Sequence, residues 1–373
     1  MDTPFLIRFI LFLIISQAFN VKSQNSLPLP DHIVIAILEN HSYERIIGST
    51  AAPYINSLTN DTSSALFTQS YGVTHPSQPN DLILFSGSTQ GVKDDLIPKG
   101  IPFTTPNIER QLLNVGKTFV SYSEDLPQVG FNGNLSGNYA RRHNPATNWM
   151  GNGKNQIPSN TNQPFTSFPS TDFKLLPTVC FVIPNTINDM HDGTDPTSIK
   201  AGDNWIKNNM ENYIQWAKAN NSLFILTFDE DNDSTQNHIL TIFTGEMVKA
   251  GQYSSRINHY SILHTLERMY RLSTIGDSIS YEPITSCWKK AFVSDSIING
   301  LIYPNPAHGF LNVELSNYLN TNVEIYNLKG ELVQVSPLLS KNTEITIDEL
   351  STGFYILKIR NKEGQIVRKF IKN

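Results

Sequence analysis

The sequence predicts an α/β domain with a mainly parallel sheet flanked by helices, followed by a small all-β sandwich. From residue 32 to about residue 272, short and almost continuous apolar runs alternate with longer mixed segments. Strands that are covered by helices on both faces typically have such almost continuous apolar sequences. After about residue 300 the chain changes to short alternating strands separated by Gly, Asn and Asp turns, as in small β-sandwiches. A length of 373 residues suits two such domains.

Five apolar runs are the expected strands of the first domain, and four amphipathic or mixed segments are its expected helices. The strands are predicted at 33–38, 118–123, 178–183, 223–228 and 239–244. The helices are predicted within 80–87, 105–116, 200–220 and 258–272. Residues 130–172 are rich in Asn, Gly, Ser, Thr and Pro, which predicts a long loop over the sheet.

The N-terminus differs from the rest of the chain. Arg8 precedes a short apolar core at 9–15, which is typical of a secretory signal peptide at 1–24 and leaves an N-terminal anchor as the alternative. The expected first domain is 25–295 and the expected sandwich 296–373. No other segment is apolar enough to cross a membrane. A net charge of −5 gives no reason to expect nucleic-acid binding. Cys180 and Cys287 are either a disulfide or two buried thiols.

Two pairs of polar residues with oxygen-bearing side chains follow predicted strands directly. Glu39 and Asn40 come after 33–38, and Asp229 and Glu230 come after 223–228. Ligands in open α/β sheets bind beyond the carboxyl ends of the strands, so these side chains are expected to meet at one edge. Carboxylate and amide oxygens suit a hard divalent ion. The alternative is that the acids are solvated loop residues.

Ser77 lies in the segment SYGVTHPSQPNDLILFSGS at 70–88. Two prolines fix the backbone around it, and the N-terminus of the following helix would favour a bound phosphate. A nearby ion would make the hydroxyl a nucleophile. The competing interpretation is that Ser77 is only a helix N-cap.

Several histidines occur in polar segments close to predicted strand ends. Such residues neutralise phosphate oxygens or protonate a leaving group, although any single one is equally a structural histidine. Arg141 and Arg142 are either phosphate ligands or surface charge. The sequence contains no Walker A loop, Gly-x-Ser-x-Gly elbow or Gly-x-Gly-x-x-Gly fingerprint. The histidines concerned are His75, His143, His191, His238 and His259.

The order of these motifs resembles the secreted phosphoesterase family, which contains acid phosphatases and the non-zinc phospholipase C enzymes. The resemblance covers about residues 30–275 through ILENHSYERIIGS, THPSQPNDLILFSGST, VIPNTINDMHDG, LTFDEDN and SRINHYSILHTLERMYRL. It implies an alkaline-phosphatase-like fold. It also implies hydrolysis of a phosphate ester through a phosphoserine on Ser77.

The resemblance further assigns roles to individual residues. Ser77, His191 and His259 are the implied catalytic residues. The implied ion ligands are Glu39, Asn40, Asp229, Glu230 and Ser77. The implied substrate-binding residues are His75, Asn80, His143, Asp189 and His238. Asn185 stands where two-zinc members of the wider superfamily have Asp. The resemblance therefore implies one divalent ion (Mg²⁺, Ca²⁺, Mn²⁺ or Zn²⁺) beside a histidine-rich phosphate pocket.

The C-terminal segment resembles the sorting domain of the type IX secretion system. The similarity is carried by IYPNPAHGFLNVEL, VEIYNLKGELV, LSTGFYILKI and VRKFIKN. It implies passage through the periplasm, release or attachment at the cell surface, and the secretion machinery as a partner. An ordinary adhesive β-sandwich is the alternative.

The expected function is that of a secreted, metal-dependent phosphomonoesterase of the acid phosphatase type. Two other functions remain open at this point. One is a phosphodiesterase or phospholipase C acting on lipid head groups. The other is a non-catalytic surface binding protein on the same fold.

Overall fold

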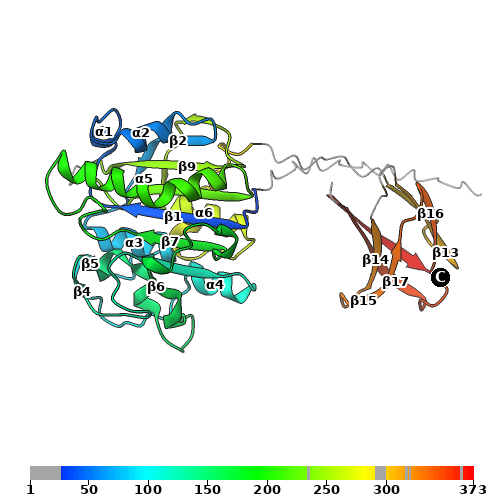
Figure 1. The fold of residues 1–373 in the computed structure, drawn as a ribbon. Helices are drawn as coiled ribbons and strands as arrows, with labels where there is room; N and C mark the ends of the chain where they lie inside the picture. The colour runs from blue at the N-terminus through cyan, green and yellow to red at the C-terminus, as the bar shows by residue number, and fades with distance from the viewer. Residues whose placement is uncertain (1–26, 233–235, 290–299, 316–317, 319–320, 362–363) are drawn as a thin grey trace, which may run out of the picture.

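The structure, a computed structural model, describes residues 27–373 except 233–235, 290–299, 316–317, 319–320 and 362–363. The predicted signal peptide at 1–24 and the predicted boundary between 295 and 296 lie outside the described residues. The described chain folds into an α/β unit and a C-terminal all-β unit, each with its own hydrophobic core (Figure 1). None of the described helices is both long and apolar enough to span a membrane.

A mixed, mainly parallel sheet forms the centre of the first unit. Its strands run in the order β10-β2-β9-β8-β1-β7-β3-β6, and β11 also pairs with β2. The strands are β1 (His32–Leu38), β2 (Ser64–Tyr71), β3 (Phe119–Ser123), β6 (Asn162–Pro164), β7 (Val179–Ile183), β8 (Ser222–Phe228), β9 (His238–Gly245), β10 (Gly251–Tyr253) and β11 (Ile257–Asn258). β9 is antiparallel to both of its neighbours, β2 and β8, whereas the other pairs in this sheet are parallel.

All five predicted strands are confirmed, and four strands of this sheet were missed, namely β2 and the short β6, β10 and β11. The run at 239–244, expected among mainly parallel strands, is the antiparallel β9. β2 was not predicted, because its sequence SALFTQSY mixes small, polar and apolar residues and carries no clear apolar run. This strand matters for function, because it leads directly into the loop that carries Ser77.

Helices cover both faces of the sheet, as predicted. In β1, Ile33 and Ile35 belong to the core shared with α3, α4 and α6, and Val34 and Ala36 belong to the core shared with α2 and α5. Each fully buried Ile or Val side chain among them contributes about 1.5–3 kcal/mol. The helices are α1 (Tyr43–Ile46), α2 (Pro53–Thr59), α3 (Ser77–Ser86), α4 (Ile108–Asn114), α5 (Thr197–Ala217) and α6 (His259–Met269).

The predicted long loop at 130–172 contains only short elements. They are the hairpin β4 (Leu135–Ser136) and β5 (Tyr139–Ala140), β6, and the 3-10 helices η1 (Arg141–His143), η2 (Pro145–Trp149), η3 (Ser159–Thr161) and η4 (Phe165–Ser167); η5 (Phe173–Leu175) and η6 (Gly276–Ser280) come later. Cys180 and Cys287 are both free and buried, so they are thiols packed in the interior and not a disulfide.

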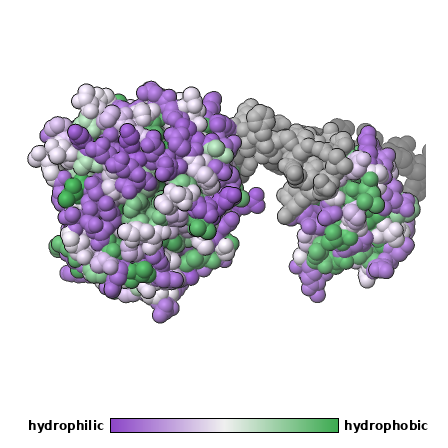
Figure 2. All heavy atoms as spheres, in the orientation of Figure 1, coloured by the Kyte–Doolittle hydropathy of each residue, from purple (hydrophilic) through white to green (hydrophobic). Residues whose placement is uncertain are grey.

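The C-terminal unit is the predicted small β-sandwich. One sheet has the order β12-β13-β16 and the other β15-β14-β17-β18, and all pairs are antiparallel. Along β13, Leu311, Val313 and Leu315 alternate inward into a single core. Large apolar side chains are also exposed on this unit, Leu332 and Val335 among them (Figure 2). The strands are β12 (Gly300–Tyr303), β13 (Phe310–Leu315), β14 (Asn322–Asn327), β15 (Leu332–Pro337), β16 (Asn342–Thr346), β17 (Gly353–Asn361) and β18 (Gly364–Lys372).

Candidate active site

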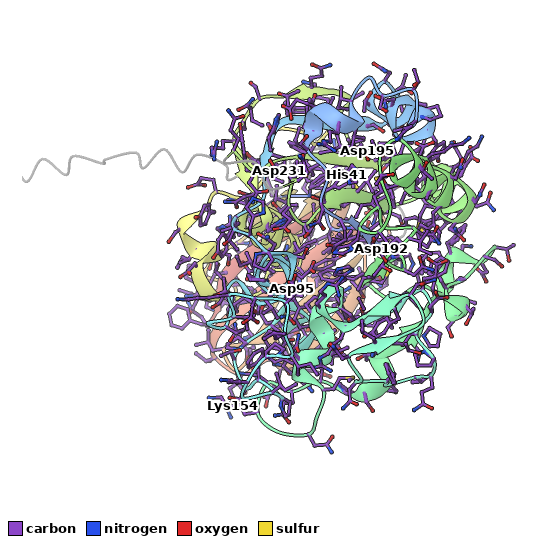
Figure 3. All side chains as sticks on the ribbon, turned by 90° about the vertical axis from the view of Figure 1, so that its left-hand side faces the viewer. His41, Asp95, Lys154, Asp192, Asp195 and Asp231 are labelled. Atoms are coloured by element: carbon purple, nitrogen blue, oxygen red, sulfur yellow. The ribbon has the colours of Figure 1, made fainter. Side chains whose placement is uncertain are left out.

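The carboxyl ends of the parallel strands bring the predicted site residues to one edge of the sheet. β1, β7 and β8 are parallel neighbours and end there. β2 and β11 end at the same edge, because β9 runs antiparallel between β2 and β8. Figure 3 looks onto this edge, where His41, Asp192 and Asp231 are labelled.

The two predicted pairs, Glu39 with Asn40 and Asp229 with Glu230, meet at the ends of β1 and β8. Asn40 adopts a left-handed backbone conformation with φ of 50°. Its backbone N–H donates to Asp229 Oδ1 at 3.0 Å, and its side-chain Nδ2 donates to Glu230 Oε1 at 3.1 Å. Asn tolerates this conformation better than most residues. The turn after β1 is therefore tied to the acidic residues after β8.

Ser77 lies against both pairs. Its Oγ is 3.4 Å from Asn40 Oδ1 and 3.3 Å from Glu230 Oε1, and the residue is buried. Ser77 is the first residue of α3, whose N-cap is Pro76. The capping interpretation of this serine is therefore wrong, and its hydroxyl faces the acidic residues instead.

The N-terminus of α3 is held by a loop that sequence reasoning missed. Pro76 offers no side-chain acceptor and Pro79 has no N–H, so the usual capping bonds are not available here. The N–H of Gln78 donates instead to Asp95 Oδ1 at 3.1 Å. No motif around Asp95 signals this contact, because it joins a surface loop to a helix 17 residues earlier.

Two further predicted residues hold the loop before Ser77. His75 Nδ1 lies 2.7 Å from Glu230 Oε2. The Asn80 side chain accepts from the N–H groups of Val73 and Thr74 at 2.9 and 3.1 Å and donates to the Thr74 carbonyl at 2.7 Å. These bonds make Asn80 a brace for the loop, while its predicted contact with a phosphate oxygen stays a prediction.

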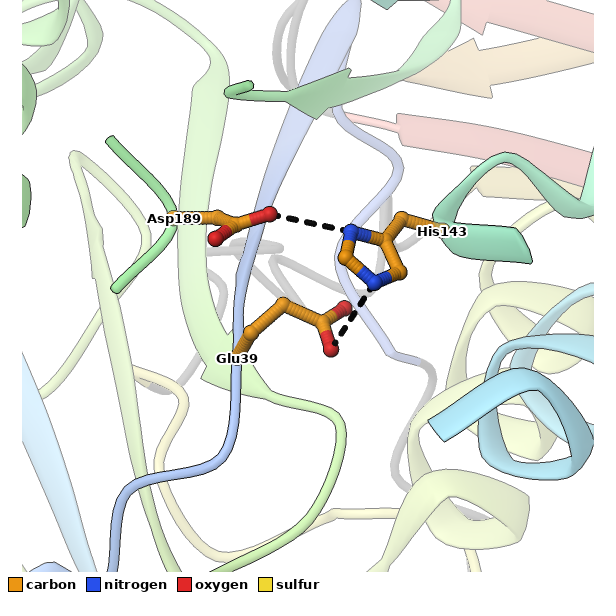
Figure 4. Close-up of side chains that lie close together, drawn as sticks. All are labelled: Glu39, His143 and Asp189. Carbon is orange, nitrogen blue, oxygen red and sulfur yellow. Dashed lines mark hydrogen bonds and ion pairs between the residues drawn. The ribbon is translucent and has the colours of Figure 1, made fainter. Parts of the chain in front are cut away.

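Glu39, His143 and Asp189 form a buried cluster (Figure 4). His143 Nδ1 is 2.9 Å from Asp189 Oδ2, and His143 Nε2 is 3.4 Å from Glu39 Oε2. The Glu39 N–H also donates to the Asp189 carbonyl at 2.8 Å. One potential ligand atom from each side chain lies within 4.8 Å of the other two.

Burial disfavours charge on all three of these groups. Burial, with the charges of Asp229 and Asp81 added, raises the pKa of Glu39 well above its usual range. Burial raises the pKa of Asp189 to about 8 and lowers the pKa of His143 to about 3. Several carboxyl groups packed around neutral imidazole are unfavourable unless they are protonated or share a cation.

The polar atoms of this region fit a divalent ion. Both carboxyl oxygens of Glu39, Asp229 Oδ2 and His143 Nε2 are buried and have no hydrogen-bond partner among the described residues. Buried polar atoms without partners cost about 1–3 kcal/mol each. An oxygen-rich ligand set with an imidazole nitrogen would satisfy them by coordinating a hard or borderline ion.

His191 borders this cluster on its more exposed side. Its ring centroid lies 5.4 Å from that of His143, and its Nδ1 is 2.9 Å from Asp192 Oδ1. Arg142 Nη2 lies 3.2 Å from His191 Nε2. The preceding Arg141 is buried and donates to the Asn132 and Thr147 carbonyls at 2.6 and 3.2 Å.

The last two predicted histidines lie in different settings. His259 begins α6, and its Nε2 is 2.6 Å from the Asp229 carbonyl; burial lowers its pKa to about 4. His238 stacks against Tyr43 and Tyr71, with ring centroids 4.6 and 5.1 Å away, and its Nδ1 is 2.6 Å from Glu44 Oε1. His238 is thus placed in an aromatic stack rather than beside Ser77.

Asp81 is a buried carboxyl group that sequence reasoning did not select. It follows Ser77 by four residues in α3, so both project from the same face of the helix. Its Oδ2 has no hydrogen-bond partner among the described residues, and burial, with Asp229 next in effect, raises its pKa well above the usual range. The four-residue spacing is a signal that could have identified it.

Comparisons with known proteins identify the family to which the chain is similar. Residues 49–273 match the family model described as the phosphoesterase family, and residues 301–373 match the secretion system C-terminal sorting domain. A phosphatidylinositol-3-phosphatase of Mycobacterium tuberculosis is 42% identical over 265 residues, which are 71% of this chain and 85% of that protein. An acid phosphatase of Aspergillus fumigatus is 30% identical over 253 residues, covering 64% of this chain and 54% of that protein.

A solved structure is similar over much of the chain. A protein in the alkaline phosphatase superfamily from Vibrio parahaemolyticus matches with a TM-score of 0.50 and 13% identity, over 85% of this chain and 84% of that one. At this identity the similarity concerns the fold, and it confirms the alkaline-phosphatase-like architecture. The chain spans about half the length of the fungal acid phosphatase.

Proposed function

The chain belongs to the phosphoesterase family and is a hydrolase of phosphate esters, and on that premise we propose that it is a metal-dependent phosphomonoesterase acting through a phosphoserine on Ser77. The observation that carries the proposal is the position of the Ser77 hydroxyl, 3.4 Å from Asn40 Oδ1 and 3.3 Å from Glu230 Oε1. The sorting domain makes this a secreted or surface enzyme.

The residues around Ser77 prepare its oxygen for attack on phosphorus. Glu230 accepts the hydroxyl hydrogen and so leaves a lone pair of Oγ available for attack on phosphorus. The positive N-terminal end of α3 favours the negative charge of a phosphoryl group beside Ser77. The Oγ–phosphorus bond forms as the bond to the leaving oxygen breaks.

The donor set suits one divalent ion next to this serine. A bound ion would lower the pKa of the hydroxyl and offset phosphoryl charge, held by Glu39, Asn40, Asp229, Glu230 and Ser77. His143 and Asp189 lie close enough to Glu39 to extend the set. His191, oriented by Asp192, is the proposed proton donor to the leaving group in the form that is protonated at Nε2, after Arg142 has left this nitrogen. His259 stabilises the Asp229 turn through the Asp229 carbonyl.

The relatives favour a phosphate monoester as substrate. One relative is an acid phosphatase and the other a phosphatidylinositol-3-phosphatase. The second name makes the monoester phosphate of a phosphoinositide a specific candidate substrate. A phosphodiesterase of lipid head groups and a non-catalytic binding protein remain as the competing functions.

The test uses the full chain stripped of metal with a chelator. We expect p-nitrophenyl phosphate hydrolysis to return when one of Mg²⁺, Ca²⁺, Mn²⁺ or Zn²⁺ is added back. Ser77→Ala should abolish it, whereas Ser86→Ala, at the other end of α3, should retain it. Phosphorylation of Ser77 should be detectable by mass spectrometry after rapid acid quenching.

Other outcomes select other functions. Faster turnover of bis-p-nitrophenyl phosphate than of the monoester would select the diesterase. Full activity in Ser77→Ala would rule out the phosphoserine. If neither ester is hydrolysed with any of the ions, the remaining function is that of a non-catalytic binding protein.

A further inference from the structure

Arg141 and Arg142 are neighbours in η1 with different surroundings. The guanidinium of Arg141 is buried and donates to two backbone carbonyls and to Asn148 Oδ1. Arg142 is only partly buried, and the contact that the structure gives its guanidinium is with His191 Nε2 at 3.2 Å. One arginine therefore braces the loop, while the other contacts His191 on the more exposed side of the cluster.

The contact between Arg142 and His191 has a defined direction. An arginine can only donate, so His191 Nε2 must accept. His191 Nδ1 then carries the ring hydrogen and donates to Asp192 Oδ1 at 2.9 Å. Neutral imidazole is a weaker partner for guanidinium than an anion is, because charge-assisted bonds to carboxylate or phosphate are roughly twice as strong. Arg142 is therefore poised to exchange this partner for an anion.

The surroundings of Arg142 leave its charge available. No carboxylate of the described residues forms an ion pair with its guanidinium, although Asp192 and Asp189 lie in its neighbourhood. Its charge acts on the buried part of the site, where it helps to lower the pKa of His143 and opposes the rise in the pKa of Asp189. The guanidinium of Arg142 therefore lies close enough to the cluster of Glu39, His143 and Asp189 for its charge to act there.

We propose that Arg142 binds the non-bridging oxygens of the substrate phosphate and makes the site specific for the monoester dianion. The proposal rests on the function proposed above, since it assigns the substrate contact of the same site. In the absence of substrate, Arg142 rests against His191 Nε2. A phosphoryl group presents two acceptor oxygens that match the planar fork of a guanidinium.

The specificity follows from charge. At neutral pH a phosphate monoester carries close to two negative charges, whereas a diester carries one and has an organic group on a second oxygen. When Glu39, Asp229 and Glu230 hold a single divalent ion in their ionised form, their negative charges offset its positive charge, so little positive charge remains for a dianion. Arg142 supplies the missing charge, and its loss should affect the dianion more than the monoanion.

The test compares Arg142→Gln and Arg142→Lys with Lys154→Gln in the full chain with the ion that restores activity. Lys154 is an exposed residue at the far end of the same face, so its variant removes one positive charge without touching the site (Figure 3). Four quantities are measured. Three are the kcat/KM values for p-nitrophenyl phosphate, for bis-p-nitrophenyl phosphate and for phosphatidylinositol 3-phosphate in vesicles, and the fourth is the Kd of inorganic phosphate by calorimetry.

We expect Arg142→Gln to lower monoester kcat/KM and phosphate affinity about 10- to 100-fold, with a clearly smaller loss on the diester. Arg142→Lys should recover part of the loss, because it returns the charge without the fork. Lys154→Gln should have the same kcat/KM values and the same phosphate Kd as the wild type. In Arg142→Gln, kcat/KM for phosphatidylinositol 3-phosphate in vesicles should fall by the same factor as kcat/KM for p-nitrophenyl phosphate.

Equal losses on both esters, or an unchanged phosphate Kd, would overturn the proposal. A loss confined to the vesicle substrate would also overturn it, since Arg142 would then contact the lipid surface and not the phosphate. Calorimetry separates this proposal from the function: phosphate binding that depends on Arg142 in a chain without turnover would support the contact and reject the enzyme.

Discussion

Asn40 ties the end of β1 to the end of β8 through its backbone, since its N–H donates to Asp229 Oδ1 at 3.0 Å while its φ is 50°. The same residue uses its side chain toward Glu230 and Ser77. Backbone shape and side-chain chemistry at this position can therefore be separated by two substitutions.

Asn40→Gly and Asn40→Ala should both lower phosphatase activity, because both remove the amide next to Ser77. Only Asn40→Ala should also destabilise the fold, by about 1–2 kcal/mol, since alanine is strained at positive φ and glycine is not. Urea unfolding monitored by tryptophan fluorescence measures the stability. Full turnover in Asn40→Gly would show that the Asn40 side chain takes no part in the reaction.

Ion binding should stabilise the folded chain through the carboxyl groups around Glu39. A divalent ion that restores activity is expected to raise the unfolding midpoint with increasing concentration, because it binds the folded state. Glu39→Gln should reduce this gain while leaving the ion-free protein at least as stable, since burial and neighbouring acids oppose charge at Glu39. Calorimetric titration with Mn²⁺ and thermal unfolding with and without chelator measure the two effects.

Glu109→Gln is the matched control, because Glu109 is a buried glutamate in α4 on a different part of the fold. Glu109→Gln should change the free energy of unfolding without changing the rise in the unfolding midpoint that the ion produces. An ion-dependent gain that survives in Glu39→Gln would remove Glu39 from the ligand set.

The strand ends were predictable from sequence because two simple regularities apply to them. Apolar runs identify strands buried on both faces, and ligands in parallel sheets gather at the carboxyl ends. Glu39 and Asp229 follow such runs directly, so their meeting at one edge needed no knowledge of the loops. Fold and sorting domain were likewise recognisable from ordered motifs.

The contacts that depend on loop paths could not be predicted in this way. Asp95 reaches the N–H of Gln78 from a loop without a motif, and His238 turned into a stack with Tyr43 although it begins a strand at the same edge. Residue type and approximate position were evident for these side chains, but their direction depends on packing between distant segments. The difference between Arg141 and Arg142 likewise emerges only from their surroundings.

Deleting residues 301–373 should separate export from catalysis. The deleted strands have their own core, and the candidate site residues all belong to the first unit. We expect the shortened chain to remain in the periplasm with its phosphatase activity retained. Activity assays on periplasm, cell surface and medium measure the distribution.

Leu357→Ala tests whether the folded sandwich is what the secretion machinery requires. Leu357 is fully buried in that core, and its truncation should cost about 2–5 kcal/mol. Export should decline while the activity per molecule is unchanged. Normal export of the deleted form would contradict the role of this domain in sorting.

Glu109 should make the stability of the fold depend on pH. Its carboxyl oxygens have no hydrogen-bond partner among the described residues, and burial raises its pKa from 4.5 to about 8. Between these values the folded state binds more protons than the unfolded state, so stability falls as pH rises.

The stabilising effect is fully present below pH 4.5 and is lost once the pH passes about 8. Glu109→Gln should remove this slope, which amounts to a relative gain of about 5 kcal/mol at high pH. Urea unfolding of both proteins at pH values across this window gives the difference directly, and parallel curves would mean that Glu109 titrates normally in the folded chain.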